Sequence, residues 1–224
     1  MWQRLYEELS PVGFTVIAVA LDSEPGAPEP WIEQASPTYP VLIDREHSVA
    51  RLYNLVNVPQ AVWINEQGRI VRPPEVAGAY DTLNRLDPVT RTVPQEVTDT
   101  ARATRLHYLS AIRDWVANGA ASPYVLSEDQ ARARMQPHDA QVAEAHTTFR
   151  LGQHLMASGR DAEGRACLEE AKRLHPESWA MWRQTATKLE NGIAAGPEYL
   201  ARVRARALED KPYYPPVDMP GVPE

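Results

Sequence analysis

The segment Phe14–Leu21, F-T-V-I-A-V-A-L, is almost continuously apolar and rich in β-branched residues. A strand with one face in water alternates apolar and polar side chains, so this run predicts a parallel strand covered on both faces. Helical patterns flank it at 1–9 and Trp31–Ala35, and a short buried strand is predicted at Val41–Ile43. Strands that alternate with helices predict an α/β sheet.

A hairpin is predicted at 57–72, with strands Ala61–Ile64 and Arg69–Arg72 and a polar turn that Gly68 closes. Pro59 stands just before the first strand, one of the few places where a sheet tolerates a residue without an N–H. Residues 73–98 are rich in proline and are predicted to be irregular.

The second half of the chain reads as helical. A helix at Ala101–Asn118 is predicted to close the first domain, which spans residues 1–121. The stripes Val142–Met156 and Gly164–Leu174 predict a helical pair, and the apolar residues from Trp179 to Ile193 predict the start of a second pair. These helices form a predicted domain at 124–210, and residues 211–224 form a proline-rich tail.

Composition excludes several classes of function. The net charge of −7 argues against nucleic acid and anionic membrane as main partners, because both require a basic face. No apolar run approaches the ~20 residues of a membrane span. The first residues lack the apolar core of a signal peptide, so the sequence predicts a cytoplasmic chain.

Residues with chemical potential are sparse. Cys167 is the single cysteine, which excludes an intrachain disulfide and favours an inert, half-buried thiol. Asp22 and Asp44 follow strands, where active sites often lie, but strand-ending loop roles are favoured. No metal site and no cofactor are predicted, because the six histidines include no i, i+4 pair; they are His47, His107, His138, His146, His154 and His175.

Three blocks in order, 13–22, 39–55 and 57–71, resemble redoxins of the thioredoxin superfamily, of the TlpA/ResA and AhpC/TSA type. The resemblance implies a thioredoxin-like domain and thiol–disulfide chemistry on a protein or small disulfide substrate. It also implies that Val58 and Pro59 bind substrate: the proline is typically cis and faces the redox motif, and the backbone before it pairs with the substrate. No C-x-x-C motif is present, so no catalytic residue is assigned in this chain.

A second resemblance concerns the helical pair. Leu151-Gly152, Gly159, Leu168, Ala171 and Pro176 match the tetratricopeptide pattern of 34 residues, while Thr148 departs from its leading aromatic. The resemblance implies a helical surface that could bind a protein partner. The fold class is therefore an α/β thioredoxin-like domain that lacks its first strand, followed by an all-α tetratricopeptide-like domain.

Three functions stay open at this point: a thiol–disulfide oxidoreductase, an inactive scaffold with a protein-binding helical module, and a peroxiredoxin-type peroxide reductase. The resemblance places a strand and a C-x-x-C or selenocysteine motif before the first helix of such a domain. We therefore expect a chain truncated before that motif. We also expect 14–21 and 61–64 to share one sheet, either paired directly or separated by about two strand spacings, ~9–10 Å.

Overall fold

The computed structural model describes residues 1–87, 89–90, 92–135, 139–190 and 192–222. Its contacts divide the chain into two compact units. Unit 1 comprises Met1–Val58 and Pro137–Gly196, and unit 2 comprises Pro59–Gln136 and Pro197–Glu224. The two units are described separately below. The domain bounds at 121, 124 and 210 stay a prediction from the sequence.

The described helices and strands follow the chain in this order: α1 Trp2–Leu9, β1 Ala18–Ala20, α2 Glu29–Ala35, β2 Val41–Ile43, α3 Ser48–Tyr53, β3 Gln60–Ile64, β4 Ile70–Val76, α4 Gln95–Asn118, α5 Glu128–Arg134, α6 Ala140–Ala157, α7 Asp161–Leu174, α8 Trp179–Arg183 and α9 Pro197–Leu208. Short 3₁₀ turns lie at Ser10–Val12, Leu83–Arg85 and Gly119–Ala121. None of the helices in the described part of the chain is both long and apolar enough to cross a bilayer.

In unit 1, β1 and β2 pair in parallel, with Ala18 opposite Val41 and Ala20 opposite Ile43. Helix α2 connects them, as a parallel pair requires. The expected long strand Phe14–Leu21 is wrong in extent and in burial. Only Ala18–Ala20 form a strand, all three residues are half-buried, and Ile17 is 60% exposed. Strand β1 pairs with β2 on one side only. Among the described strands, none pairs with the flanking residues 14–17 and Leu21 to lengthen the ladder.

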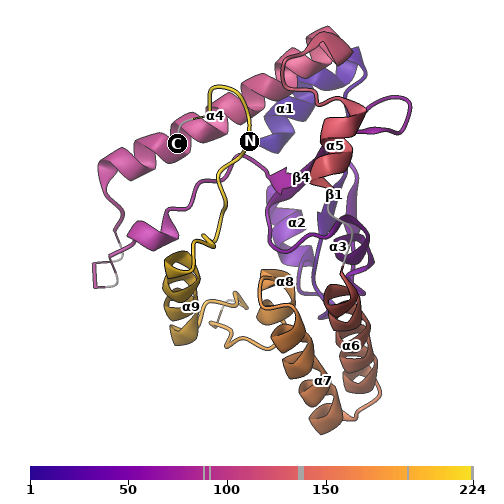
Figure 1. Cartoon of the computed structure of the whole chain (residues 1–224), viewed down its shortest axis with the longest axis vertical. Helices are drawn as coiled ribbons and strands as arrows, with labels where there is room; N and C mark the ends of the chain where they lie inside the picture. The colour runs from indigo at the N-terminus through magenta and orange to yellow at the C-terminus, as the bar shows by residue number, and fades with distance from the viewer. Residues whose placement is uncertain (88, 91, 136–138, 191, 223–224) are drawn as a thin grey trace. The chain divides into compact units, whose positions relative to one another are not determined.

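Helices α6 and α7 lie side by side and are joined by a short turn (Figure 1). Their shared core holds the residues that the sequence predicted for it, Phe149, Leu168 and Ala171, with Met156 packed against them. Close contact requires glycine at two points: a Cβ on Gly152 or Gly164 would stand under 3.0 Å from the opposite helix. The predicted antiparallel pair is therefore confirmed as a tightly packed hairpin.

The predicted helix from Trp179 to Ile193, the start of the second pair, is wrong for most of its length. Helix α8 covers only Trp179–Arg183, and residues 184–190 and 192–196 form turns rather than a helix. The β-branched Thr185 and Thr187 and the following glycines disfavour helix there. The short α8 nevertheless contributes Met181 to the core of the α6–α7 pair.

In unit 2, β3 and β4 form an antiparallel hairpin that is longer than predicted. Strand β4 continues to Val76 through Pro73 and Pro74, which the sequence placed in an irregular segment. Arg72 pairs with Trp63 and Glu75 with Ala61, so the two prolines stand opposite a single residue at a bulge. Prolines fit a strand at such a point because no ladder N–H is needed there.

Helix α4 and the C-terminal tail complete unit 2. Helix α4 begins at Gln95, six residues before the predicted start, directly after Pro94. The tail contains no helix or strand among its described residues, yet it is partly buried: Tyr213, Val217 and Met219 are each less than 10% exposed. The Tyr213 ring packs against that of Tyr214, with centroids 4.5 Å apart.

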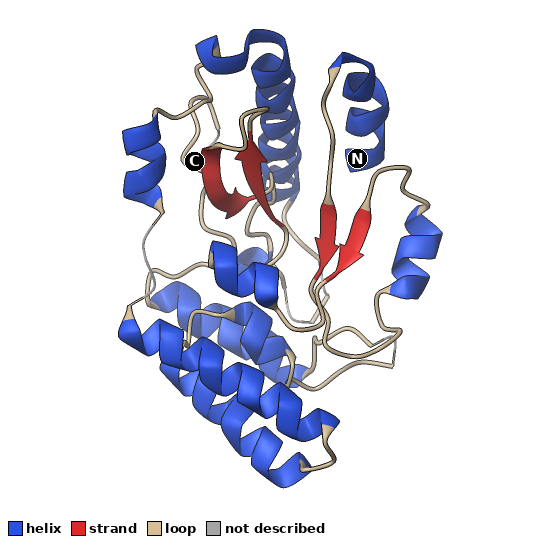
Figure 2. Ribbon diagram, turned by 90° about the vertical axis from the view of Figure 1, so that its right-hand side faces the viewer, coloured by secondary structure: helices blue, strands red, loops and turns tan. Residues whose placement is uncertain are grey.

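The strands belong to two separate two-stranded sheets, β1–β2 and β3–β4 (Figure 2). The expectation that 14–21 and 61–64 pair directly is therefore wrong. The physical reason is that β1 finds its partner in β2 and β3 finds its partner in β4, within different units. The alternative, a separation by two strand spacings, stays a prediction.

Candidate functional site

The carboxyl ends of β1 and β2 carry two aspartates with structural roles. Asp44 follows β2, and its carboxylate accepts hydrogen bonds from the backbone N–H groups of Ser48 (2.9 Å) and Val49 (2.7 Å). Those N–H groups open α3 and have no partner within the helix, so Asp44 satisfies them. Asp22 follows β1 and accepts from the N–H of Glu24 at 3.0 Å. Both residues have the loop roles that the sequence favoured.

His47 lies beside these aspartates and was not singled out from the sequence. It precedes α3 with φ of 54°, and its side chain is only 4% exposed. Burial lowers the pKa of His47, although the charges of Asp44 and Asp22 act in the opposite direction. The imidazole is therefore neutral near pH 7. No sequence pattern around His47 could have indicated this burial, because Phe149 of α6, more than 100 residues away, covers the ring with centroids 5.1 Å apart.

Unit 1 contains a cavity of about 770 Å³. One wall is β1 with its following loop, and a second wall is α2 with Trp31 and Ile32. The opposite side is formed by Arg183, Gln184, Lys188 and residues 192–194, and Lys188 forms an ion pair with Glu24. Burial raises the pKa of Tyr39 at the cavity, so this phenol stays protonated near neutral pH. The size and the mainly apolar lining suit an organic ligand or a peptide side chain.

The segment before β3 contains the substrate-binding residues that the resemblance implies. Val58 is 38% exposed, and Pro59 is also exposed. Buried Asn57 fixes the chain just before them: its Oδ1 accepts from the Val58 N–H at 2.9 Å and from Arg183 Nη2 at 2.8 Å. Pro59 is the first residue of unit 2, and its carbonyl accepts from the Ala77 N–H at 3.2 Å. Both residues are accessible, and their role with substrate stays a prediction.

Unit 2 buries a cluster of aromatic and charged residues around Arg72. The Arg72 guanidinium donates to both oxygens of Glu75, at 2.7 Å each, and stands 5.5 Å from the Trp63 ring centroid. Trp63 Nε1 donates to the Tyr108 hydroxyl at 2.9 Å and its ring stacks on Trp115 at 5.0 Å. Burial and, to a smaller degree, the Glu75 charge raise the pKa of Tyr108, so the phenol is not a nucleophile. The cluster has the character of a polar core.

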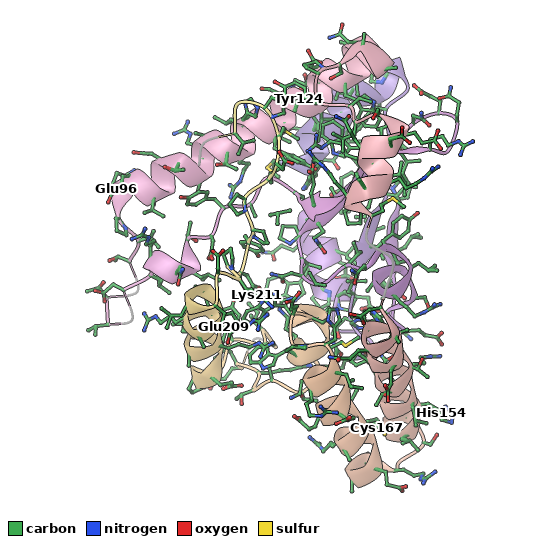
Figure 3. The ribbon with its side chains drawn as sticks, in the orientation of Figure 1. Glu96, Tyr124, His154, Cys167, Glu209 and Lys211 are labelled. Carbon is green, nitrogen blue, oxygen red and sulfur yellow. The ribbon has the colours of Figure 1, made fainter. Side chains whose placement is uncertain are left out.

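Several of the remaining chemical candidates lie on or next to the helical pair (Figure 3), whereas His107 lies on α4 with its Nε2 2.7 Å from the Pro220 carbonyl. Cys167 is a half-buried free thiol on α7, and His154 is exposed on α6. His146 and His175 are buried with ring centroids 5.9 Å apart. Across the described residues, no three His, Cys, Asp or Glu side chains come together in a way that could hold a metal ion. His138 lies outside the described residues.

Residues 1–72 match the sequence model of the AhpC/TSA family, which corresponds to 72 of the 224 residues. No curated protein and no solved structure matches the chain. The matched segment contains the β1–α2–β2–α3 order, β3, and the exposed Val58–Pro59 step. The match supports a redoxin of the thioredoxin superfamily, and the short sheets with helices throughout are compatible with a thioredoxin-like part followed by a helical region.

Proposed function

We propose that this chain is part of a thiol–disulfide oxidoreductase of the TlpA/ResA-like redoxin type. In this enzyme, Val58 and Pro59 bind the substrate. The observation that carries the proposal is the family match over residues 1–72, which includes both residues. Their exposure supports it, because a substrate chain must reach the backbone at this step. A protein or small-molecule disulfide is the proposed substrate.

The chemistry requires two sulfur or selenium atoms. A thiolate attacks one substrate sulfur, the substrate S–S bond breaks, and the other substrate sulfur leaves as a thiolate. A second thiol then resolves the mixed disulfide, so the enzyme dithiol loses the two electrons that the substrate gains. Cys167 alone cannot complete this cycle. We therefore place the reactive C-x-x-C or selenocysteine motif in a segment N-terminal to Met1 of a longer product, which would also supply the first strand.

The test compares gene products in a disulfide reduction assay. The gene is expressed with about 60 upstream codons, an allowance for a strand of ~5–6 residues, its lead-in and the motif. The longer product should reduce a protein disulfide, and Pro59→Ala should lower that rate while Pro25→Ala, in an exposed loop, should not. If the upstream region encodes no thiol or selenol and the 224-residue chain folds stably alone, the oxidoreductase proposal fails.

A catalytically inactive scaffold is the second candidate. The α6–α7 hairpin supports it, because the glycine-mediated contact of Gly152 and Gly164 resembles a tetratricopeptide pair, and such pairs bind protein partners. This candidate predicts a stable chain with no exchange activity in any longer product. A peroxiredoxin-type peroxide reductase requires the same additional thiol, and the longer product would distinguish it by consuming peroxide.

A further inference from the structure

Within unit 1, α6 packs against the turn between β2 and α3, here called the β2–α3 corner and comprising Asp44–Ala50. Gln153 donates to Ser23 Oγ (2.7 Å) and to the Arg45 carbonyl (3.1 Å), and Arg150 forms an ion pair with Glu46 at 2.5 Å. These contacts lie at the edge of the interface, where water competes for the charged groups. The centre of the interface is the edge-to-face contact of the His47 and Phe149 rings.

The centre of this interface has almost no room for water. A cavity of about 10 Å³ lies there, about the smallest volume that holds one water molecule. His47, Ala50 and Leu55 line it from the corner side, and the other lining residues are His146 and Phe149 of α6 and Ser178, Ala180 and Met181. His47 Nε2 is buried without a hydrogen-bond partner in the described structure. A protonated imidazole would bring a second N–H and a positive charge into this confined space.

Several charged groups surround His47. Asp22 and Asp44 lie at the ends of β1 and β2, and both favour the charged imidazole. The Asp44 oxygens already accept two backbone N–H groups, which reduces what they offer to His47. Arg45 and Glu46 belong to the corner itself, and α6 contributes His146 and Arg150. The lining residues Ser178, Ala180 and Met181 carry no titratable group.

We propose that His47 makes the attachment of α6 to the β2–α3 corner sensitive to acid, so that the helical pair detaches reversibly as the pH falls below about 6.5. Detachment exposes His47 to water, where it takes up a proton. The direction of the pH effect follows from the linkage between proton binding and attachment. The attached state has the lowered histidine pKa and binds fewer protons, so its stability is complete above the ordinary pKa and declines as the pH falls through it.

Hydrogen exchange of the 224-residue chain between pH 7.5 and 5.5, corrected for the intrinsic exchange rate, tests the proposal. Protection in residues 149–153 of α6 and in residues 47–53 should fall by up to tenfold per pH unit below about 6.5, the limit for uptake of one proton. Helix α4, in the other unit, should keep its protection. An equal loss in α4 would indicate global unfolding and would overturn the proposal, as would unchanged protection in α6.

Two variants assign the effect to His47. His47→Asn keeps a residue that tolerates the positive φ and removes the titrating group, so protection should become independent of pH. His154→Asn, at an exposed position of α6, should keep the dependence of the original chain. A pH dependence that persists in His47→Asn overturns the proposal. If that variant fails to fold, an NMR titration of the original chain replaces it, and a His47 pKa at or above 6.5 overturns the proposal as well.

Discussion

Arg72 illustrates how much one buried side chain can connect. Its guanidinium binds Glu75, the Tyr124 carbonyl at 2.7 Å and the Asp218 carbonyl at 2.9 Å, and its side chain is 1% exposed. Replacing Arg72 by alanine removes this donor from the Tyr124 carbonyl and the Glu75 carboxylate, while the Asp218 carbonyl still accepts from Arg134 Nη1 at 3.2 Å. Breaking a buried pair in this way costs about 3–5 kcal/mol of unfolding free energy. Urea denaturation of Arg72→Ala should show a loss of this size.

The matched control is Arg132→Ala. Arg132 also forms an ion pair with a glutamate, Glu128, at 2.8 Å and one helical turn away on α5. In this pair, however, both side chains are 72% exposed. An exposed pair at this spacing contributes about 0.3–0.5 kcal/mol, so the control should unfold almost like the original chain. Equal losses in the two variants would contradict the assignment of Arg72 as the centre of the unit 2 core.

The second residue-scale prediction concerns Cys167. Helix α7 holds it half-buried next to the core residue Leu168, and the chain offers no second cysteine to resolve a mixed disulfide. Cys167→Ser and Cys167→Ala should therefore leave disulfide reduction by the longer gene product unchanged. Lost activity in a Cys167→Ala variant that melts normally would place the chemistry on the helical pair instead.

Sequence reasoning at this scale succeeds where the cause is local. Asp44 could be assigned a loop role because its partners, Ser48 and Val49, are four and five residues away. His47 and Arg72 could not be found, since their burial depends on Phe149 and Asp218, which are far away in the chain. A histidine before a short helix and an arginine at the end of a predicted strand are ordinary surface residues until the distant partners are known.

At the scale of elements, the α6–α7 contact leads to a prediction that opposes helix propensity. Alanine is favoured over glycine by about 1 kcal/mol inside a helix. At Gly164, however, a Cβ would stand 2.9 Å from the Met156 backbone nitrogen and 2.7 Å from its Cγ. The backbone cannot move aside without separating the helices, so Gly164→Ala should lower the melting temperature of the chain.

Ala166→Gly is the control for this prediction. Ala166 is exposed on the same helix, and its replacement tests propensity without a contact. It should cost about 1 kcal/mol by propensity alone, whereas Gly164→Ala should lose stability despite a favourable propensity change. A stabilised Gly164→Ala variant would mean that the helix contact is looser than the structure describes.

Helices and strands were predicted correctly where nearby residues mark their ends. The strand Val41–Ile43 was predicted with its observed bounds because Pro40 precedes it and Asp44 follows it, but its predicted burial is wrong, since Leu42 is 54% exposed. Helix α7 was predicted through its apolar stripe and the terminating Pro176. The failures have tertiary causes. Phe14–Leu21 has strand composition along its whole length, but only three residues find a partner in β2, and Pro73–Pro74 continue β4 because a bulge accommodates them.

At the scale of the molecule, each compact unit combines segments that are distant in sequence. In unit 1 the N-terminal 58 residues pack with the helical pair through His47 on Phe149, and with α8 through the Ala180 N–H, which donates to the Val56 carbonyl at 3.1 Å. In unit 2 the tail is fixed by the Tyr213 N–H, which donates to Asp81 Oδ2 at 3.0 Å. Changes in composition along the chain can only divide the sequence into consecutive domains. They do not indicate which distant segments pack together.

The last prediction follows from this interleaving and concerns the fragment 122–224. The α6–α7 hairpin is one good repeat with a short α8 beside it, while about three repeats are needed for an independent solenoid. Without residues 1–121, Phe149 loses His47, Gln153 loses Ser23 and Arg45, and Ala180 loses Val56. The fragment should therefore show helical circular dichroism without a cooperative thermal transition, whereas the full chain melts cooperatively. Co-expression of residues 1–58 should restore part of the transition, because these residues supply the lost contacts of the helical region within unit 1. A fragment that melts cooperatively on its own would show that the helical region is self-sufficient. That result would favour the scaffold function, because an independent helical module could bind a protein partner without the redoxin-like part.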